Sequence, residues 1–181
     1  MKGIGLGPAP TEKATPLLVL DLDGTVRHGK DELGYFVNKV SDVVIFPEAL
    51  IQMRAWKAKG GRIIAVSNQG GIAMGFMDFD ECVRTMRRTH ELCEGLFDKI
   101  AFCRHHPDAI DPEYARCWCR KPSPGLLIES ALDLASMVRP REFYPSYMGL
   151  FVGDRPEDEE CAKLSGFPFK WAAKWREEAA Q

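Results

Sequence analysis

The sequence lacks any apolar run long enough to cross a membrane. No stretch approaches the roughly eighteen consecutive apolar residues that make a membrane-spanning helix a candidate. Its first residues, MKGIGLGPAPTEKATP, are rich in glycine and proline and lack the apolar core of a secretory signal. We therefore expect a cytoplasmic protein without membrane contact, and a flexible lead-in over residues 1–15.

An excess of charge of either sign is also missing. The formal net charge is -2 at pH 7, and the hydrophobic fraction of 45% is ordinary for a soluble protein. This balance predicts neither nucleic acid nor a membrane surface as a partner. Internal repeats and low-complexity segments are absent, and 181 residues suffice to bury one sizeable core. We expect a monomer with a single domain over residues 16–181.

Short apolar runs alternate with amphipathic stretches along the chain. The runs predict strands over residues 17–20, 62–68, 98–103, 147–154 and 167–171. The stretches between them predict helices over residues 47–59, 78–96, 124–137, 157–164 and 172–180. Residues 27–46 read as a loop or a small hairpin. The alternation predicts an α/β fold: a Rossmann-like, doubly wound parallel sheet in one domain.

The segment DLDGTV follows the first predicted strand. Side chains alternate along a strand, so Asp21 and Asp23 point the same way, and two close carboxylates need a cation such as Mg²⁺. Gly24 allows a sharp turn, and the Thr25 hydroxyl can donate a hydrogen bond. A plain turn after a strand is the alternative reading. Further polar residues follow the other strands, where open α/β sheets bind ligands: Ser67, Asn68, Cys103, His105 and Asp154.

A cluster of cysteine and histidine lies in CRHHPDAIDPEYARCWCRKP, residues 103–122. Cys103, His105, Cys117 and Cys119 form two close pairs joined by a loop, a donor set that suits a structural, tetrahedral Zn²⁺. His106 could replace His105 as a ligand. The alternatives are a disulfide, which the spacing and the expected compartment disfavour, and three buried thiols without a metal.

Four motifs in order resemble those of the haloacid dehalogenase (HAD) superfamily over about residues 17–165. They are D-x-D-G-T, a serine after the second strand, a lysine in RKP, and an acidic motif after the fourth strand with Asp154 and Asp158. The resemblance implies that Asp21 is the nucleophile, which forms an aspartyl-phosphate. It also implies that Asp23 is first the acid for the leaving alcohol and then the base for water.

The remaining roles follow from the same resemblance. Ser67 and the backbone around Asn68 would hold phosphoryl oxygens together with Thr25, and Lys121 would neutralise charge. Catalytic Mg²⁺ would lie between Asp21, Asp154 and the backbone carbonyl of Asp23. Asp158 would contact a metal-bound water or lie on a solvated helix face. An acid at position 23 favours phosphatase over dehalogenase chemistry, because an alkoxide needs a proton and a halide does not.

The cysteine and histidine loop is similar to the zinc loop of bacterial D-glycero-D-manno-heptose-1,7-bisphosphate phosphatases and histidinol-phosphate phosphatases. The segment NQGGIAMG resembles their N-Q-S-G-I-A-R-G loop, with Gly71 for serine and Met74 for arginine. Leu22 and Arg155 also depart from residues that are usual there, and Arg120 would be a second phosphate contact.

The resemblance implies a small phosphorylated substrate, such as a sugar phosphate or histidinol phosphate. We expect an open site without a large cap, with the metal-bound loop as its main wall. The alternative is a nucleic-acid 3′-phosphatase, because the phosphatase domains of polynucleotide kinase/phosphatases share D-x-D-G-T, the N-Q loop and K-P. The aromatic tail, residues 166–178, also resembles theirs, although core packing is the simpler interpretation of that tail.

Overall fold

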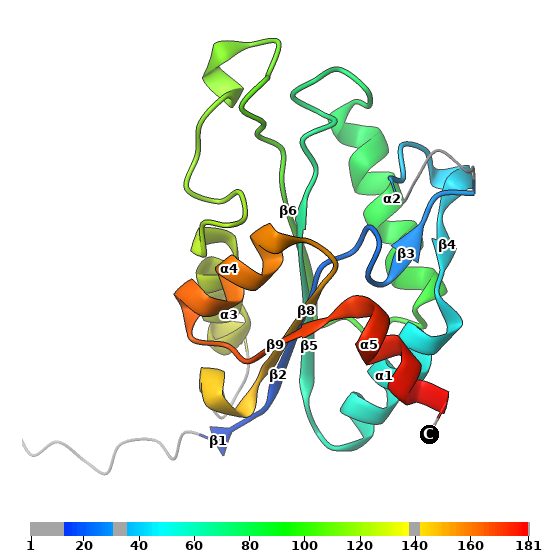
Figure 1. Ribbon diagram of the computed structural model, residues 1–181, viewed down its shortest axis with the longest axis vertical. Coiled ribbons are helices and arrows are strands. Elements are labelled where there is room, and N and C mark those ends of the chain that lie inside the picture. The colour runs from blue at the N-terminus through cyan, green and yellow to red at the C-terminus, as the bar shows by residue number, and fades with distance from the viewer. Residues whose placement is uncertain (1–12, 31–35, 138–141, 181) are drawn as a thin grey trace, which may run out of the picture.

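The fold is built on a five-stranded parallel sheet in the order β6-β5-β2-β8-β9 (Figure 1). The computed structural model describes residues 13–30, 36–137 and 142–180. The strands are β2 (Leu17–Leu20), β5 (Arg62–Asn68), β6 (Lys99–Cys103), β8 (Leu150–Gly153) and β9 (Phe169–Trp171). The chain runs outward from β2 to one edge and then crosses to the other side. This topology confirms the predicted doubly wound α/β fold.

Helices cover both faces of the sheet (Figure 1). One face carries α1 (Pro47–Ala58), α2 (Phe79–Leu92) and α5 (Ala172–Glu177); the other carries α3 (Gly125–Met137) and α4 (Pro156–Ser165). The alternation of side chains along β2 divides the core in two. Leu18 and Leu20 belong to the first layer, and Leu17 and Val19 belong to the second. β2 is therefore buried on both faces, as its continuous apolar run predicts.

The helix boundaries follow from local chemistry. Pro47 occupies the first turn of α1, where its missing N–H costs nothing. Asp78 caps α2, because its carboxylate accepts a 2.6 Å hydrogen bond from the backbone N–H of Glu81. The predicted extension of this helix to residue 96 is wrong. Glu94 and Gly95 adopt positive φ values of 57° and 71°, which no right-handed helix tolerates.

Smaller elements refine the predicted pattern. Residues 27–46 contain an antiparallel pair, β3 (Arg27–His28) with β4 (Val44–Ile45), as the hairpin interpretation predicts. Residues 1–12 of the predicted lead-in lie outside the described residues. Its end belongs to the fold, because β1 (Lys13–Ala14) pairs in parallel with β7 (Glu142–Phe143). The described residues also contain four short 3-10 helices: Val40–Asp42, Pro112–Tyr114, Ser146–Met148 and Glu178–Ala180.

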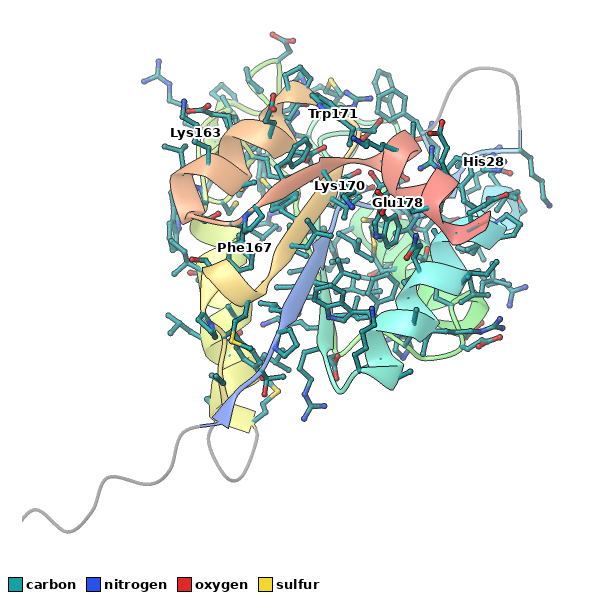
Figure 2. The ribbon with its side chains drawn as sticks, turned by 60° about the horizontal axis from the view of Figure 1, so that its bottom comes forward. His28, Lys163, Phe167, Lys170, Trp171 and Glu178 are labelled. Atoms are coloured by element: carbon teal, nitrogen blue, oxygen red, sulfur yellow. The ribbon has the colours of Figure 1, made fainter. Side chains whose placement is uncertain are left out.

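The aromatic tail divides between the core and the surface. Trp175 is buried in the core with Ala172, which supports the core-packing interpretation of this segment. Trp171 is 41% exposed, and the neighbouring Lys170 forms an ion pair with Glu178 at 2.8 Å (Figure 2). None of the helices in the described part of the chain is both long and apolar enough to cross a membrane.

Candidate active site

The carboxyl ends of β2 and β5 open into a cavity of about 690 Å³. Most of the predicted catalytic and phosphate-binding residues line it: Asp21, Asp23, Ser67, Asn68, Arg120 and Lys121. They come from three separate segments of the sequence. Parallel strands bring them together because their carboxyl ends meet at one edge of the sheet.

Lys121 is the buried cation of this site. Its Nζ lies 2.5 Å from Oδ1 of Asp21 and 2.7 Å from Oδ1 of Asp158, and it donates to the backbone carbonyl of Val66 at 2.7 Å. Burial alone would lower the pKa of Lys121, but the two carboxylates outweigh it and hold the pKa above its ordinary value. Lys121 therefore stays charged between two acidic groups.

Three carboxylates meet beside this lysine. Asp21, Asp154 and Asp158 each offer an oxygen, and these oxygens lie within 4.8 Å of one another. Burial raises the pKa of Asp21 to about 7 and that of Asp154 to about 6. Oδ1 of Asp154 is buried and has no hydrogen-bond partner among the described residues. A buried oxygen without a donor, in a cluster of carboxylates, fits a hard cation such as Mg²⁺.

Gly24 allows Asp154 to reach this cluster. A Cβ at position 24 would lie 2.2 Å from Oδ2 of Asp154, and the residue has a φ of 88°. Any side chain there would displace the carboxylate and strain the turn. The glycine of the D-x-D-G-T motif therefore makes room for an aspartate that lies 130 residues later in the sequence.

Asp158 is part of the site and does not lie on a solvated helix face. It is 1% exposed, and its Oδ2 accepts hydrogen bonds from the backbone N–H groups of Asp154 and Arg155 at 3.2 and 3.1 Å. The solvated alternative is therefore wrong. Asp158 lies one turn into α4 on the side that faces the sheet, whereas the neighbouring Glu159 is exposed. Oδ1 of Asp158 holds the ammonium group of Lys121 together with Asp21.

Two residues that sequence reasoning missed hold Asp23. Arg27 donates through Nε to Oδ1 of Asp23 at 2.8 Å, and Gln69 donates to Oδ2 at 2.7 Å. Gln69 Nε2 also lies 2.8 Å from Oγ of Ser67, which links the predicted acid to the predicted phosphate-binding serine. Gln69 belongs to the N-Q loop quoted above, so its place in that motif could have identified it as a site residue. The sequence offers no signal that separates Arg27 from a surface arginine.

The side chain of Asn68 is occupied by Lys121. Asn68 donates through Nδ2 to the carbonyl of Lys121 and accepts at Oδ1 from its N–H, both at 3.0 Å. These two bonds orient the side chain toward the backbone of Lys121, while the backbone of Asn68 is the group predicted to contact phosphate. The structure does not bring Thr25 into the cavity: it is fully buried, and its hydroxyl has no hydrogen-bond partner among the described residues.

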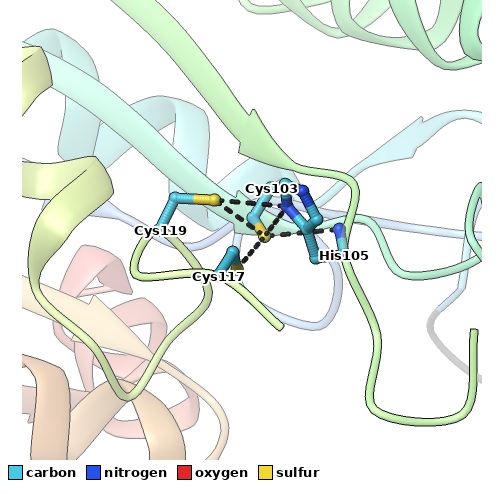
Figure 3. Close-up of side chains that lie close together, drawn as sticks. All are labelled: Cys103, His105, Cys117 and Cys119. Carbon is cyan, nitrogen blue, oxygen red and sulfur yellow. Dashed lines mark hydrogen bonds between the residues drawn. The ribbon is translucent and has the colours of Figure 1, made fainter. Parts of the chain in front are cut away.

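The four predicted zinc ligands converge at one point (Figure 3). Sγ of Cys103 lies 3.6 Å from Sγ of Cys117 and 3.2 Å from that of Cys119, and Nδ1 of His105 lies 3.5 Å from Sγ of Cys103. Sulfur atoms bonded to one tetrahedral zinc at about 2.3 Å stand about 3.8 Å apart, close to this spacing. All six cysteines are free, which contradicts the disulfide alternative.

The structure separates the roles of the two neighbouring histidines. His105 turns its Nδ1 toward Cys103 and Cys119, while His106 lines the active-site cavity. Arg120 connects the two sites, because it donates to the carbonyl of His105 at 2.9 Å and also lines the cavity. One residue, Arg120, therefore separates the cluster from Lys121 in the sequence, and the same residue links the cluster to the cavity in space.

The prediction that the metal-bound loop forms the main wall is wrong. That loop contributes only His106 and Arg120 before Lys121. More of the wall comes from residues 36–38 and from the glycine-rich segment 69–77. The loop instead supports the glycine-rich segment from outside, through a 2.9 Å hydrogen bond from the N–H of Ile110 to the carbonyl of Ala73.

Comparisons with known proteins agree with this site. No protein-family model matches the chain. A D-glycero-β-D-manno-heptose-1,7-bisphosphate 7-phosphatase from Photorhabdus laumondii is 32% identical over 156 residues, which cover 83% of this chain and 76% of that protein.

Two solved structures share the fold. One is a D,D-heptose 1,7-bisphosphate phosphatase from B. bronchiseptica, complexed with magnesium and phosphate. It superposes with a TM-score of 0.67 at 25% sequence identity, and the alignment covers 86% of this chain and 79% of that chain. The other is a HAD-like phosphatase from Mesorhizobium loti. It has a TM-score of 0.74 at 24% sequence identity, and the alignment covers 97% of this chain and 89% of that chain. On the sequence match, the chain belongs to the D-glycero-β-D-manno-heptose-1,7-bisphosphate 7-phosphatase family, and it is a phosphatase with the HAD-like fold.

Proposed function

We propose that this chain is a Mg²⁺-dependent phosphomonoester hydrolase that acts on a small phosphorylated metabolite through an aspartyl-phosphate at Asp21. The observation that carries the proposal is the position of Asp21 between the buried Lys121 ammonium and two further carboxylates. A lysine that served only in a structural ion pair would need one carboxylate partner. Three carboxylates around one lysine leave negative charge for a metal to neutralise.

In the first step, a carboxylate oxygen of Asp21 attacks phosphorus and the bond from phosphorus to the leaving oxygen breaks. Asp23 gives its proton to that oxygen, so the product departs as a neutral alcohol. Lys121, with the hydroxyl of Ser67 and the backbone around Asn68, holds the negative phosphoryl oxygens. Asp21, Asp154 and the Asp23 carbonyl would hold Mg²⁺, which supplies positive charge for the transferring group.

In the second step, Asp23 takes a proton from a water molecule. The water oxygen bonds to phosphorus, and the acyl–phosphate bond breaks to release inorganic phosphate and free Asp21. Arg27 and Gln69 hold Asp23 in one orientation for both steps. The Cys103, His105, Cys117 and Cys119 cluster would hold a structural Zn²⁺ that positions Arg120 and Lys121.

Heptose 1,7-bisphosphate is the first substrate to test, because the relatives that match this chain are named for it. Histidinol phosphate is the second. The experiment measures phosphate release from both compounds, from p-nitrophenyl phosphate and from a 3′-phosphorylated oligonucleotide, with Mg²⁺ and after its removal. Activity on the oligonucleotide alone would favour the alternative, a nucleic-acid 3′-phosphatase.

An Asp21→Asn variant tests the intermediate. Rapid acid quenching with ³²P-labelled substrate should trap label on the wild-type protein and none on this variant, which should also release no phosphate. Asp133→Asn, which changes an exposed aspartate on α3, is the matched control and should keep both signals. Unchanged phosphate release by Asp21→Asn would refute the proposed nucleophile.

A further inference from the structure

The turn after β2 is held by a side chain from α5. Nη1 of Arg176 donates to the carbonyls of Gly24 and Thr25 at 2.7 and 2.8 Å. These two residues directly follow Asp23 in the D-x-D-G-T motif, and Arg176 lies 152 residues after Gly24 in the sequence. Hydrogen bonds from a charged donor are about twice as strong as those between neutral groups, so the two contacts fix the backbone of the turn.

Phe46 supports the same arrangement. Its N–H donates to the carbonyl of Val26, the next residue of the turn, at 3.0 Å. The guanidinium carbon of Arg176 lies over the ring of Phe46, 4.0 Å from the ring centre, which is a cation–π distance. The aromatic ring thus helps to keep the guanidinium at the turn. The carbonyls of three successive residues, 24–26, are therefore bonded to groups outside the turn.

The helix that carries Arg176 is itself fixed to the core. Ala172 and Trp175 of α5 are buried, and Nε2 of Gln52 on α1 donates to the carbonyl of Trp175 at 2.8 Å. α5 lies beside α1 on the same face of the sheet (Figure 1). Arg176 therefore reaches the turn from a firmly packed helix.

The turn positions two parts of the candidate active site. It carries Asp23, and the side chains of Arg27 and Gln69 bond only the carboxylate of that residue. It also contains Gly24, whose missing side chain makes room for Asp154. A shift of the turn would therefore move the acid and base and the proposed Mg²⁺ site together. A misplacement of about 1 Å can lower a catalytic rate about a hundredfold.

Arg176 does not line the cavity, so any effect on the reaction passes through the turn and not through the substrate. We propose that Arg176 is a positioning residue, which fixes the backbone of the D-x-D-G-T turn and thereby the place of Asp23. This inference rests on the proposed phosphatase function and adds a residue of α5 to its machinery. The alternative is that Arg176 only fastens α5 to the rest of the domain.

Steady-state kinetics with heptose 1,7-bisphosphate tests this role. Arg176→Met removes both hydrogen bonds and keeps an unbranched side chain. We expect kcat to fall at least about tenfold while KM stays within about twofold, because no contact with the substrate is lost. Arg176→Lys can still donate to a carbonyl, and its kcat should lie between those of the wild type and Arg176→Met.

Two variants are the controls. Gln52→Ala loosens the attachment of α5 to α1 and leaves the turn untouched, and Lys174→Met removes an exposed charge from the same helix as Arg176. Both should keep the wild-type kcat. A wild-type kcat in folded Arg176→Met, or an equal loss of kcat in Gln52→Ala, would overturn the inference.

Amide hydrogen exchange measures the turn without any catalysis. The N–H groups of Val26 and Arg27 both donate to the carbonyl of Leu22, at 2.9 and 3.0 Å. In zinc-loaded, magnesium-free protein, they should exchange at least about tenfold faster in Arg176→Met than in the wild type or Gln52→Ala. Loss of a hydrogen bond to a charged group shifts an equilibrium by at least about that factor. Unchanged exchange of these two amides would contradict the inference.

Exchange and turnover together separate this inference from the proposed function. Faster exchange in Arg176→Met, in a protein that hydrolyses none of the test esters, would refute the proposed phosphatase function and support the positioning of the turn. Phosphate release by the wild type, with both exchange and kcat unchanged in Arg176→Met, would refute the inference and leave the proposed function standing.

Discussion

Arg27 is fully buried and its Nε lies 2.8 Å from Oδ1 of Asp23, the predicted acid and base. The same guanidinium donates to Oγ1 of Thr89 at 2.7 Å and to the carbonyl of Thr85 at 3.3 Å, both on α2. A side chain from β3 thus ties the acid to a helix that is about sixty residues further along the sequence. Asp23 cannot rotate without breaking this ion pair.

Removing the arginine should disable Asp23 without preventing binding. We expect Arg27→Met to lower kcat about 100-fold with little change in KM, the lower range for loss of a positioned acid and base. Steady-state kinetics measures this, and circular dichroism checks folding. Arg88→Met, at an exposed arginine on α2, is the control and should keep the wild-type kcat. A folded Arg27→Met protein with unchanged kcat would show that Arg27 does not position Asp23.

Asp21 and Asp23 should differ in their effect on stability. Asp23→Asn leaves the Arg27 charge buried without a counter-charge, which should lower the free energy of unfolding by about 3 kcal/mol. Burial, together with a smaller effect of Asp158, raises the pKa of Asp21 to about 7 against the opposing effect of Lys121. Ionised Asp21 is therefore destabilising without Mg²⁺. Asp21→Asn should be as stable as the wild type at pH 7.5 or more stable by about 1 kcal/mol.

Urea unfolding of zinc-loaded, magnesium-free protein measures both variants, and both should be inactive. A stability loss of Asp21→Asn equal to that of Asp23→Asn would contradict the difference that we assign to their surroundings. Adding Mg²⁺ should stabilise the wild type more than Asp21→Asn, because the variant lacks one of the proposed ligands.

The cysteine and histidine cluster should contain about one zinc per chain in protein purified without added metal. Burial raises the pKa of the Cys103 thiol, so a cation is needed to hold it as a thiolate. We expect Cys117→Ser to lose the metal and about 4 kcal/mol of the free energy of unfolding. This is the stabilisation that a bound ligand contributes when its free concentration is about a thousand times its Kd. Elemental analysis and thermal unfolding check this result.

The control for the zinc cluster is Cys161→Ala, at a buried thiol outside it. This variant should keep its zinc and lose about 1 kcal/mol, as expected for a small loss of core volume. Full zinc content and full stability in Cys117→Ser would refute the metal site. Because Arg120 and Lys121 directly follow Cys119, kcat should fall together with zinc content.

The side chain of Asn68 should affect catalysis through Lys121 and not through contact with the substrate. Asn68→Ala removes both hydrogen bonds to the backbone of Lys121, which should cost about 2 kcal/mol of stability and lower kcat at least about tenfold. Gln52→Ala removes one side-chain hydrogen bond elsewhere, to the carbonyl of Trp175, and is the control. It should lose about 1 kcal/mol and keep the wild-type kcat. Equal kcat values in both variants would contradict this positioning role.

The elements of the fold and most residues of the candidate site follow from patterns that are visible in the sequence alone. Continuous apolar runs marked the parallel strands, and polar residues at their carboxyl ends, such as Asp21, Ser67 and Asp154, had to meet at one edge of the sheet. The spacing of Cys103, His105, Cys117 and Cys119 was likewise enough to predict that these four side chains come together, because they lie in two short segments. These are local patterns, and local patterns are visible in a single sequence.

Which neighbours surround these residues depends on the tertiary structure. The burial of Asp158, the pairing of Arg27 with Asp23, and the separation of His105 from His106 depend on how helices and loops far apart in sequence pack together. Phe36 and Phe76 likewise line one cavity, although they belong to two segments that meet only in the folded chain. The protonation state and the burial of a side chain depend on its neighbours in space, and local sequence patterns do not show which residues those neighbours are.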